Sequence, residues 1–137
     1  MDTAKQIVSN YYKLNFLDNS VEDFIAFYHP DCSLNWHSSK GFKKLNYDDL
    51  VASITNISRS YTYLRADVSH IIEEGNHVSI RFALHGTTIE DEDNEVPLAY
   101  YNTIWEVKDG KLYRGFEMSQ PADHSQESLN SFNEIKV

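Results

Sequence analysis

The segments IIEEGNHVSIRFALHG (residues 71–86) and YYNTIWEVKDGKLYRGFEMS (residues 100–119) decide the fold of this chain. Each alternates apolar and polar side chains, which is the period of a β-strand with one buried face. Glu74-Gly75-Asn76 predicts a turn in the first segment, and Lys108-Asp109-Gly110 predicts a tight hairpin turn in the second. An acidic loop joins the two segments. We therefore expect consecutive antiparallel strands over this part of the chain.

Upstream of these strands, three stretches repeat apolar side chains at helical spacing. Each opens with a capping residue, namely Thr3, Ser20 or Asn46, followed three residues later by Gln or Asp. The first helix is predicted over residues 3–17. The second is predicted to end at His29-Pro30, because the residue before a proline disfavours the α conformation. The sequence thus predicts three amphipathic helices ahead of the long strands.

Two more strands and a tail complete the predicted elements. Residues 32–36 form a short strand, residues 37–44 a polar loop, and residues 61–73 a long alternating strand. Residues 120–137 are interpreted as a polar tail that is partly disordered or forms a short helix, since few of its side chains are apolar. The large apolar side chains of this tail, spaced three residues apart, are Leu129, Phe132 and Ile135.

The charge and composition of the chain exclude several classes of partner. The formal net charge is −9, and residues 61–137 contribute −8 of it, from six Lys or Arg against fourteen Asp or Glu. Such a field repels phosphate backbones and anionic membrane surfaces, so no nucleic-acid or membrane partner is expected. The single Cys32 excludes an intramolecular disulfide and fits a reducing, cytoplasmic location. The histidines show no metal-binding spacing, and neither a metal nor a cofactor is expected.

The order of helices and strands resembles the nuclear transport factor 2-like superfamily, and within it the SnoaL-like, polyketide cyclase-like branch. The likeness is carried by YYKLNFLDNS, FIAFYHPDCSLNW, GNHVSIRFALHG and IWEVKDGKLYRGFE, which are spread over most of residues 3–119. The resemblance implies an α+β, cystatin-like cone in one domain over residues 1–119. In such a cone, three N-terminal helices pack on the concave face of a strongly curved, mixed, mainly antiparallel sheet. The resemblance also implies a pocket at the open end and a homodimer through the convex sheet face.

The steroid isomerases of this superfamily provide a first catalytic pattern for comparison. They use a carboxylate base on the first strand and an oxyanion-binding pair of a tyrosine and a carboxylic acid. By the resemblance, Tyr11 matches that tyrosine and Asn102 falls where the strand acid would be. The base position falls at Asn35 or Trp36, and neither side chain can take a proton. The standard isomerase interpretation is therefore rejected.

Glu117 is the candidate acid or base. The hairpin register predicts that it lies opposite Asn102, on the face that the resemblance directs into the cone. Burial among apolar side chains raises the pKa of a carboxyl group toward neutral pH, where it can both take and give a proton. The alternative is a solvated Glu117, or one paired with Arg114 or Lys111 at the sheet edge. His70 is a second candidate, since it shares a strand face with Val68 and Ile72 and is predicted to point into the cone; its alternative is a satisfied core histidine.

Further side chains are predicted to line the pocket. Trp36 and His37 end the first strand beside the pocket mouth, where Trp36 would either stack on a flat ligand ring or plug the cone. Tyrosine hydroxyls would orient an oxygenated ligand, and large apolar side chains would form the wall. The candidates on the long strands are Tyr63, Ile80, Phe82 and Tyr100.

These residues predict a small-molecule pocket without defining a reaction. The first hypothesis is a SnoaL-like enzyme that binds a small apolar oxygenated molecule and acts as a cofactor-independent acid–base lyase or isomerase. In it, Glu117 and His70 carry protons, and Tyr11 donates hydrogen bonds. Asn102 is the second hydrogen-bond donor. The alternative hypothesis is a non-catalytic ligand-binding or dimeric interaction module.

Overall fold

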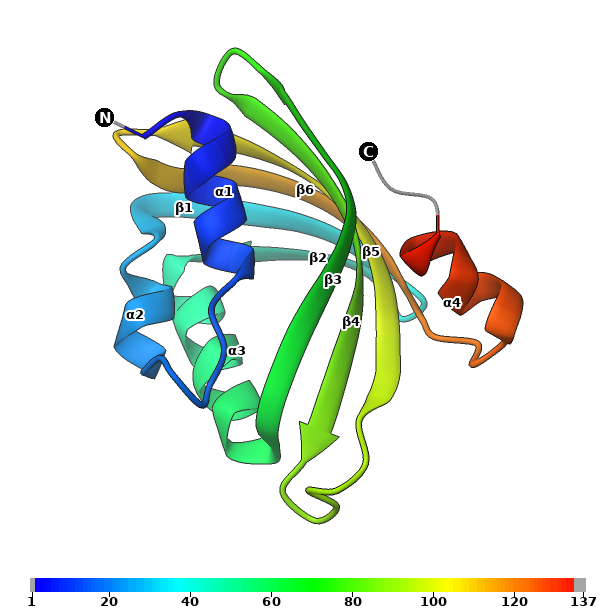
Figure 1. Ribbon diagram of the computed structural model, residues 1–137. Helices are drawn as coiled ribbons and strands as arrows, with labels where there is room; N and C mark the ends of the chain where they lie inside the picture. The colour runs from blue at the N-terminus through cyan, green and yellow to red at the C-terminus, as the bar shows by residue number, and fades with distance from the viewer. Residues whose placement is uncertain (1, 135–137) are drawn as a thin grey trace.

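The computed structural model describes residues 2–134, and Figure 1 shows the path of the chain. The elements in chain order are α1 (Ala4–Tyr12), α2 (Val21–Ile25), β1 (Tyr28–Ser38), β2 (Gly41–Asn46), α3 (Tyr47–Ser60), β3 (Tyr61–Glu74), β4 (His77–Thr88), β5 (Val96–Lys108), β6 (Lys111–Pro121) and α4 (Gln126–Asn133).

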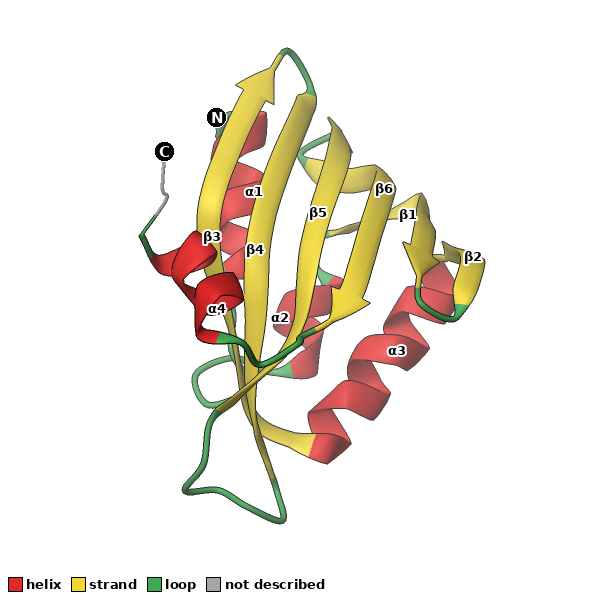
Figure 2. Cartoon of the chain, turned by 90° about the vertical axis from the view of Figure 1, so that its right-hand side faces the viewer, coloured by secondary structure: helices red, strands yellow, loops and turns green. Residues whose placement is uncertain are grey.

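Within residues 2–134, six strands form one mixed sheet in the order β2-β1-β6-β5-β4-β3. Neighbouring strands are antiparallel except β1 and β6, which are parallel. Helices α1, α2 and α3 cover one face of this sheet, which we call the inner face, and α4 lies against the other, the outer face (Figures 1 and 2). The chain is therefore an α+β protein with its N-terminal helices packed on a mixed sheet, as its sequence predicts.

The three predicted helix caps are confirmed. Thr3, Ser20 and Asn46 each accept a hydrogen bond from the backbone N–H three residues further on, and the side chain of that residue bonds back to the cap. Such reciprocal bonds satisfy backbone groups that a helix leaves unpaired at its start. These caps fix where α1, α2 and α3 begin, and so fix how they approach the sheet.

Helix α1 ends at Tyr12, earlier than the predicted end at residue 17. The Asn15 side-chain oxygen accepts hydrogen bonds from the backbone N–H groups of Leu17 and Asp18. Local bonding of this kind offers the backbone an alternative to the helix, which is why asparagine disfavours helix interiors. The chain therefore leaves the helix before Asn15 and turns toward α2.

The prediction of a polar loop over residues 37–44 is wrong. Strand β1 extends to Ser38, and β2 pairs with it as an antiparallel hairpin. Gly41 has a φ of +103°, a conformation that glycine adopts without steric cost, and it closes this turn. The side chains of β2 are mainly exposed, so its sequence carries no alternation that would indicate a strand.

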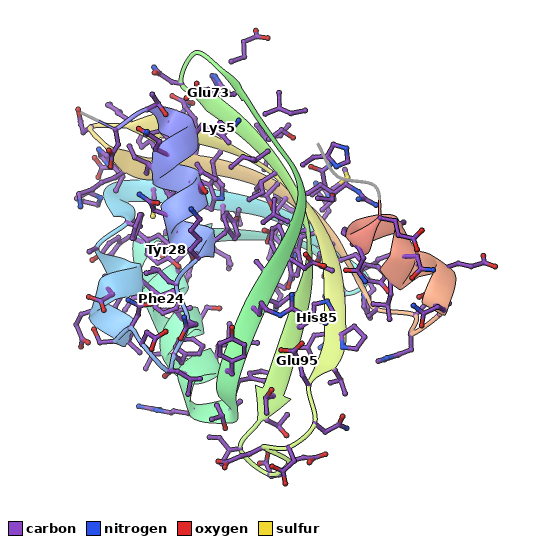
Figure 3. The ribbon with its side chains drawn as sticks, in the orientation of Figure 1. Lys5, Phe24, Tyr28, Glu73, His85 and Glu95 are labelled. Carbon is purple, nitrogen blue, oxygen red and sulfur yellow. The ribbon has the colours of Figure 1, made fainter. Side chains whose placement is uncertain are left out.

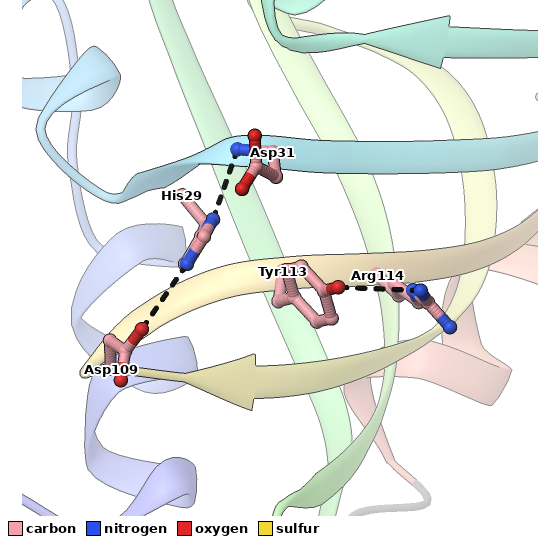
Figure 4. A network of polar contacts seen from close by, with 5 residues as sticks. All are labelled: His29, Asp31, Asp109, Tyr113 and Arg114. Atoms are coloured by element: carbon pink, nitrogen blue, oxygen red, sulfur yellow. Dashed lines mark hydrogen bonds and ion pairs between the residues drawn. The ribbon is translucent and has the colours of Figure 1, made fainter.

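A β-bulge in the hairpin between β5 and β6 shifts the register of the sheet. Leu112 and Arg114 pair with consecutive residues of β5, so Tyr113 is an extra residue on β6. Figure 4 shows this corner, where the Arg114 guanidinium donates a hydrogen bond to the Tyr113 hydroxyl at 3.3 Å. In the same view, the His29 ring lies 3.3 Å from the Asp109 carboxylate of the turn. The tight turn is present as predicted, and the bulge follows it.

This bulge decides which side chains share a face. Beyond it, Glu117 pairs with Thr103, whereas the sequence predicted that it would pair with Asn102. That prediction is wrong by one residue, because the turn fixes the register only as far as the bulge. Asn102 consequently lies on the outer face, while Glu117 and Thr103 lie on the inner face.

A second irregularity lies in β3, between Val68 and His70. His70 pairs with Arg81, and its ring contacts the Ser69 hydroxyl at 2.9 Å. Arg81 lies on the outer face, since its neighbours along β4 are buried against the helices. The bulge therefore turns His70 to the outer face, and the prediction that it points into the cone is wrong.

The main core lies between the inner face and helices α1 and α3. Its most buried apolar side chains include Val8, Val78, Ile80, Trp105 and Leu112. Removing such apolar surface from water is the main favourable contribution to folding. At one end of this layer, the Lys5 backbone N–H donates to the Glu73 carboxylate at 2.8 Å, which fixes α1 to the end of β3 (Figure 3).

The C-terminal tail contains the short helix α4, which packs on the outer face. Phe132 of this helix is buried, and its ring stacks on the Tyr100 ring with centroids 4.9 Å apart. Leu129 is half-buried, while Ile135 lies outside the described residues. The apolar side chains noted in the tail sequence therefore include the one that anchors α4.

Candidate functional site

A cavity of about 190 Å³ lies between the inner face and helices α1 and α3, and we call it the inner cavity. Its walls combine aromatic and aliphatic side chains and carry one carboxylate. The side chains that define its chemistry are Tyr11, Tyr12, Tyr28, Trp36, Tyr101, Trp105 and Glu117. A second cavity of about 150 Å³ is lined by Tyr11, Tyr12 and Tyr101 and otherwise by apolar side chains. The two cavities therefore adjoin, one with a carboxylate and the other without.

Glu117 reaches the inner cavity from β6. Its carboxylate accepts a hydrogen bond from the Thr103 hydroxyl at 2.7 Å, and Thr103 is 0 % exposed. Burial raises the pKa of the Glu117 carboxyl from its ordinary 4.5 to about 7, while the Thr103 hydrogen bond acts in the opposite direction. Near neutral pH, both the acid and the carboxylate are therefore populated, as a group that moves protons requires.

The ion pair with Arg114 or Lys111 that was the alternative for Glu117 is not formed. Arg114 donates to the Tyr113 hydroxyl, and the Lys111 ammonium donates to the Ala26 carbonyl oxygen. Among residues 2–134, no basic side chain forms an ion pair with Glu117. The carboxyl group is thus held by a neutral donor in an apolar, aromatic setting.

Tyrosine hydroxyls from α1 and β1 lie in the same cavity. The hydroxyls of Tyr11 and Tyr28 are 2.6 Å apart, and the Trp105 indole N–H donates to the Tyr12 hydroxyl at 2.9 Å. Burial raises the pKa of Tyr11 and of Tyr12 well above 10, so both remain protonated. Because the Tyr12 oxygen already accepts from the indole, its own hydrogen can be donated to a ligand.

The charge of Glu117 links it to this tyrosine cluster. Burial is the largest cause that raises the pKa of Tyr12 and of Tyr101, and the negative charge of Glu117 is the second largest. The hydroxyls and the carboxyl group are therefore within electrostatic range of each other, and an oxygen atom of a ligand placed among them could contact both kinds of group.

Trp36 forms the wall next to Glu117. Strand β1 pairs with β6 in parallel, and Trp36 is the partner of Glu117 in that register. The indole N–H donates to the Ser119 hydroxyl at 2.8 Å, which fixes the ring. Its ring therefore borders the cavity instead of filling it.

The structure brings several sequence-predicted residues together. Glu117, Tyr11 and Trp36 line the inner cavity. Phe82 lines the second cavity, where its ring stacks on Tyr101 with centroids 4.9 Å apart. Ile80 is fully buried in the adjoining core.

The other predicted residues lie elsewhere. Asn102 and Tyr100 border a cleft beneath α4 on the outer face. His37 is exposed, with its ring 4.7 Å from the Phe42 ring. Tyr63 precedes a residue of β3 that lines the second cavity, so it faces outward with His70. Asn102 and His37 also line, together with Glu117, an outer-face cleft of about 350 Å³, whereas His70 is not among its lining residues.

On β5, Thr103, Tyr101 and Trp105 are site residues that the sequence-predicted site did not include, and Tyr12 and Tyr28 are two more on α1 and β1. The three β5 residues alternate along the strand, so the sequence indicated that they share a face. The signal that would have assigned this face to the cavity is the bulge at Tyr113, which no local pattern marks.

The described part of the chain has neither a metal-binding cluster nor a membrane-spanning helix. Residues 2–134 contain no group of three or more His, Cys, Asp or Glu side chains placed to hold a metal ion. No helix within that range has both the length and the apolar character needed to cross a membrane.

Comparison with known families gives one match. The model of the SnoaL-like domain matches residues 8–115, which include the second half of α1, the strands up to the middle of β6, and most residues of the inner cavity. No curated protein matches the chain.

Several solved structures are similar. IdmH from Streptomyces antibioticus, provisionally assigned as a polyketide cyclase, has a TM-score of 0.66 and 14% identity, covering 86% of this chain and 92% of its own. An NTF2-like protein from Burkholderia pseudomallei has a TM-score of 0.62 and 16% identity, covering 100% of both chains. A ketosteroid isomerase-like protein from Catenulispora acidiphila, solved with trimethylamine, has a TM-score of 0.63 and 10% identity, covering 81% of this chain and 82% of its own. At these identities, the likeness shows a shared NTF2-like fold.

Proposed function

The chain belongs to the SnoaL-like domain family, and from this premise we propose that it binds a small apolar oxygenated molecule in the inner cavity. The proposed activity is acid–base chemistry without a cofactor, as a lyase or an isomerase. In this proposal the curved sheet and its helices form a cone, and the inner cavity lies within it. A cytoplasmic location is part of the same proposal.

One observation carries the proposal, namely the state of the Glu117 carboxyl. It is half-buried, has a neutral hydrogen-bond donor and no basic partner among the described residues, and its pKa is raised to about 7. A carboxyl group that is merely structural is more often ion-paired or solvated. A group that ionises near the working pH is the one that general acid–base catalysis uses.

The geometry supports a role for each group. Glu117 as carboxylate takes a proton from a carbon next to a carbonyl group, and the neutral acid then returns it. If the neutral acid returns the proton to another carbon of the ligand, the reaction is an isomerisation. If it returns the proton to a leaving hydroxyl group, water is released and the reaction is a dehydration. The Tyr12 hydroxyl, and one hydroxyl of the Tyr11–Tyr28 pair, donate to the carbonyl oxygen as negative charge develops there.

A non-catalytic binder is the second candidate, and the aromatic walls favour it. The relative from Catenulispora acidiphila was solved with trimethylamine. Aromatic rings around a carboxylate also suit a small ammonium ion, which is attracted to ring faces and to the negative charge. In this case, Glu117 would remain a carboxylate in the complex and the ligand would leave unchanged.

A single NMR experiment tests both candidates. The protein is incubated in D₂O with a panel of small ketones and hydroxy ketones, and deuterium uptake next to the carbonyl is followed with time. Uptake that is lost in Glu117→Gln and kept in Glu92→Gln, an exposed loop carboxylate, supports the enzyme. The absence of uptake for the whole panel, together with movement of the Trp36 and Trp105 indole signals on adding trimethylammonium, supports the binder.

The proposal also includes a homodimer through the outer face. Three large apolar side chains are exposed there, Ile104 at 44%, Phe116 at 48% and Met118 at 66%. Contiguous exposed apolar side chains are typical of contact surfaces. Sedimentation velocity tests this part, because Met118→Asp would convert a dimer to a monomer and would leave a monomeric wild type unchanged.

A further inference from the structure

A cleft of about 370 Å³ lies on the outer face, where α4 packs against the sheet. We call it the α4 cleft. Its polar side chains include Arg81, Asn102, Gln120 and Ser131, and its exposed large apolar side chain is Met118, at 66%, while Phe132 is buried. None of its lining side chains is acidic. This is unusual on a chain with a formal net charge of −9.

Arg81 is held rigidly in this cleft. Its guanidinium lies over the Phe132 ring, 3.9 Å from the centroid. It donates hydrogen bonds to the Ser69 hydroxyl at 2.7 Å and to the Ser131 hydroxyl at 3.2 Å. Ser69 is 1% exposed, so one anchor of the guanidinium is a buried side chain. A fixed guanidinium loses little further entropy when it binds a ligand.

The guanidinium lacks a charged partner within the described part of the chain. Both acceptors are neutral hydroxyls, and residues 2–134 place no carboxylate in an ion pair with Arg81. Arg65, further along the same face, instead pairs with Glu95 at 2.9 Å. Asp123, at the start of α4, is bonded to serine and tyrosine hydroxyls. The two bonds of Arg81 leave other N–H donors of its guanidinium for an anion.

We propose that the α4 cleft binds the carboxylate of a small aromatic acid, with Arg81 as its receptor. A guanidinium matches the two oxygens of a carboxylate. The amide groups of Asn102 and Gln120 can donate to the same anion, and the exposed Met118 side chain can contact an apolar ring. One cation in a negatively charged protein favours a monoanion over a dianion such as phosphate. This site does not involve Glu117, and it borders the surface proposed for the homodimer, because both include Met118.

Titration with benzoate, followed by the ¹H–¹⁵N NMR spectrum, tests the proposal. Benzamide, which has the same shape without the charge, and inorganic phosphate are titrated in parallel. We expect benzoate to shift the backbone signals of Arg81, Gln120 and Ser131 until binding saturates. Benzamide and phosphate should shift the same signals much less. The Trp105 indole signal, which reports on the inner cavity, should stay in place. Equal effects of benzamide, or movement of the Trp105 indole signal alone, would overturn it.

Two variants assign the binding to the guanidinium. Arg81→Gln should weaken benzoate binding at least about tenfold, the value of one charge-assisted hydrogen bond, while Arg65→Gln should leave it unchanged. Because Arg81→Gln also removes contacts that hold α4, Ser131→Asp provides an independent test. It places a carboxylate against Arg81 and keeps α4 attached, so it should abolish binding without lowering the melting temperature. Wild-type affinity in either cleft variant would contradict the proposal.

Discussion

Thr103 and Glu117 face each other across β5 and β6, and the Thr103 hydroxyl donates a hydrogen bond to the Glu117 carboxylate at 2.7 Å. This bond favours the charged form of the carboxyl group, whereas burial favours the neutral form. Burial is the larger effect, and the resulting pKa of about 7 keeps both forms available.

Glu117→Gln is expected to stabilise the protein above neutral pH. The folded-state pKa of Glu117 is raised to about 7 from 4.5, so as pH rises between these values the unfolded chain loses its proton while the folded chain keeps it. Folding is therefore penalised progressively over this range, by up to roughly 3 kcal/mol above pH 7. Chemical denaturation at pH 8 should show the variant to be more stable, with the difference vanishing near pH 4.

The matched control is Glu92→Gln, which removes an exposed carboxylate. Its stability should follow that of the wild type at every pH, to within about 0.5 kcal/mol. A Glu117→Gln variant that is less stable than wild type at pH 8 would show that the Glu117 charge is compensated in the folded protein.

Thr103→Val should raise the pKa of Glu117 further. The substitution preserves the shape of the side chain and removes the hydroxyl that stabilises the carboxylate. Carboxyl ¹³C NMR titration measures the change directly. Thr103→Ser, which keeps the hydroxyl, should restore the wild-type value, and Thr87→Val, at another buried threonine, should not alter it. An unchanged titration in Thr103→Val would mean that the bond does not influence ionisation.

Tyr12→Phe should destabilise the fold by about 1–3 kcal/mol, because the buried Trp105 indole N–H loses its acceptor. Urea denaturation measures the loss, and the Trp105 indole signal should move. Tyr113→Phe removes a hydroxyl that is bonded at the surface, and it should cost less than about 0.5 kcal/mol. Equal losses in the two variants would argue against a specific role for the Trp105–Tyr12 bond.

Gly115→Ala is expected to disturb the inner cavity. An added Cβ would lie 2.6 Å from Leu34 Cδ1 and 2.8 Å from Trp105 Cζ3, so the indole ring would have to shift. Overpacking of this kind costs about 1–3 kcal/mol. Gly86→Ala is the comparison, since its closest contacts are the ends of the Leu98 and Leu64 side chains, which can rotate. The Trp105 indole signal should therefore move in the first variant only.

Local signals in the sequence predicted the fold well. The caps at Thr3, Ser20 and Asn46 depend on residues three apart, and a single sequence contains that information. The hairpin turn at Asp109-Gly110 is equally local. Strand β2 was missed because its side chains are mainly exposed and show no alternation, and only its pairing with β1 makes it a strand.

The candidate site was predicted only in part, because strand pairing, which local sequence does not encode, decides which side chains share a face. Glu117, Tyr11 and Trp36 were predicted from alternation and resemblance, and they share the inner cavity. Asn102 and His70 were misplaced because each lies beyond a bulge. A bulge is set by the pairing of distant strands, and Tyr113 is an ordinary strand residue by composition.

The extra residue on β6 has a consequence for how such a protein could change. Deletion of Tyr113 would remove the bulge and keep every pair beyond it, because Arg114 and the residues after it would still face the same partners on β5. If the hairpin instead closed without the bulge at its present length, each later residue of β6 would move by one position, and Asn102 would replace Thr103 opposite Glu117. The neighbour of the carboxyl group therefore depends on the backbone conformation at Tyr113, and the hairpin tolerates loss of the extra residue better than loss of the bulge around it.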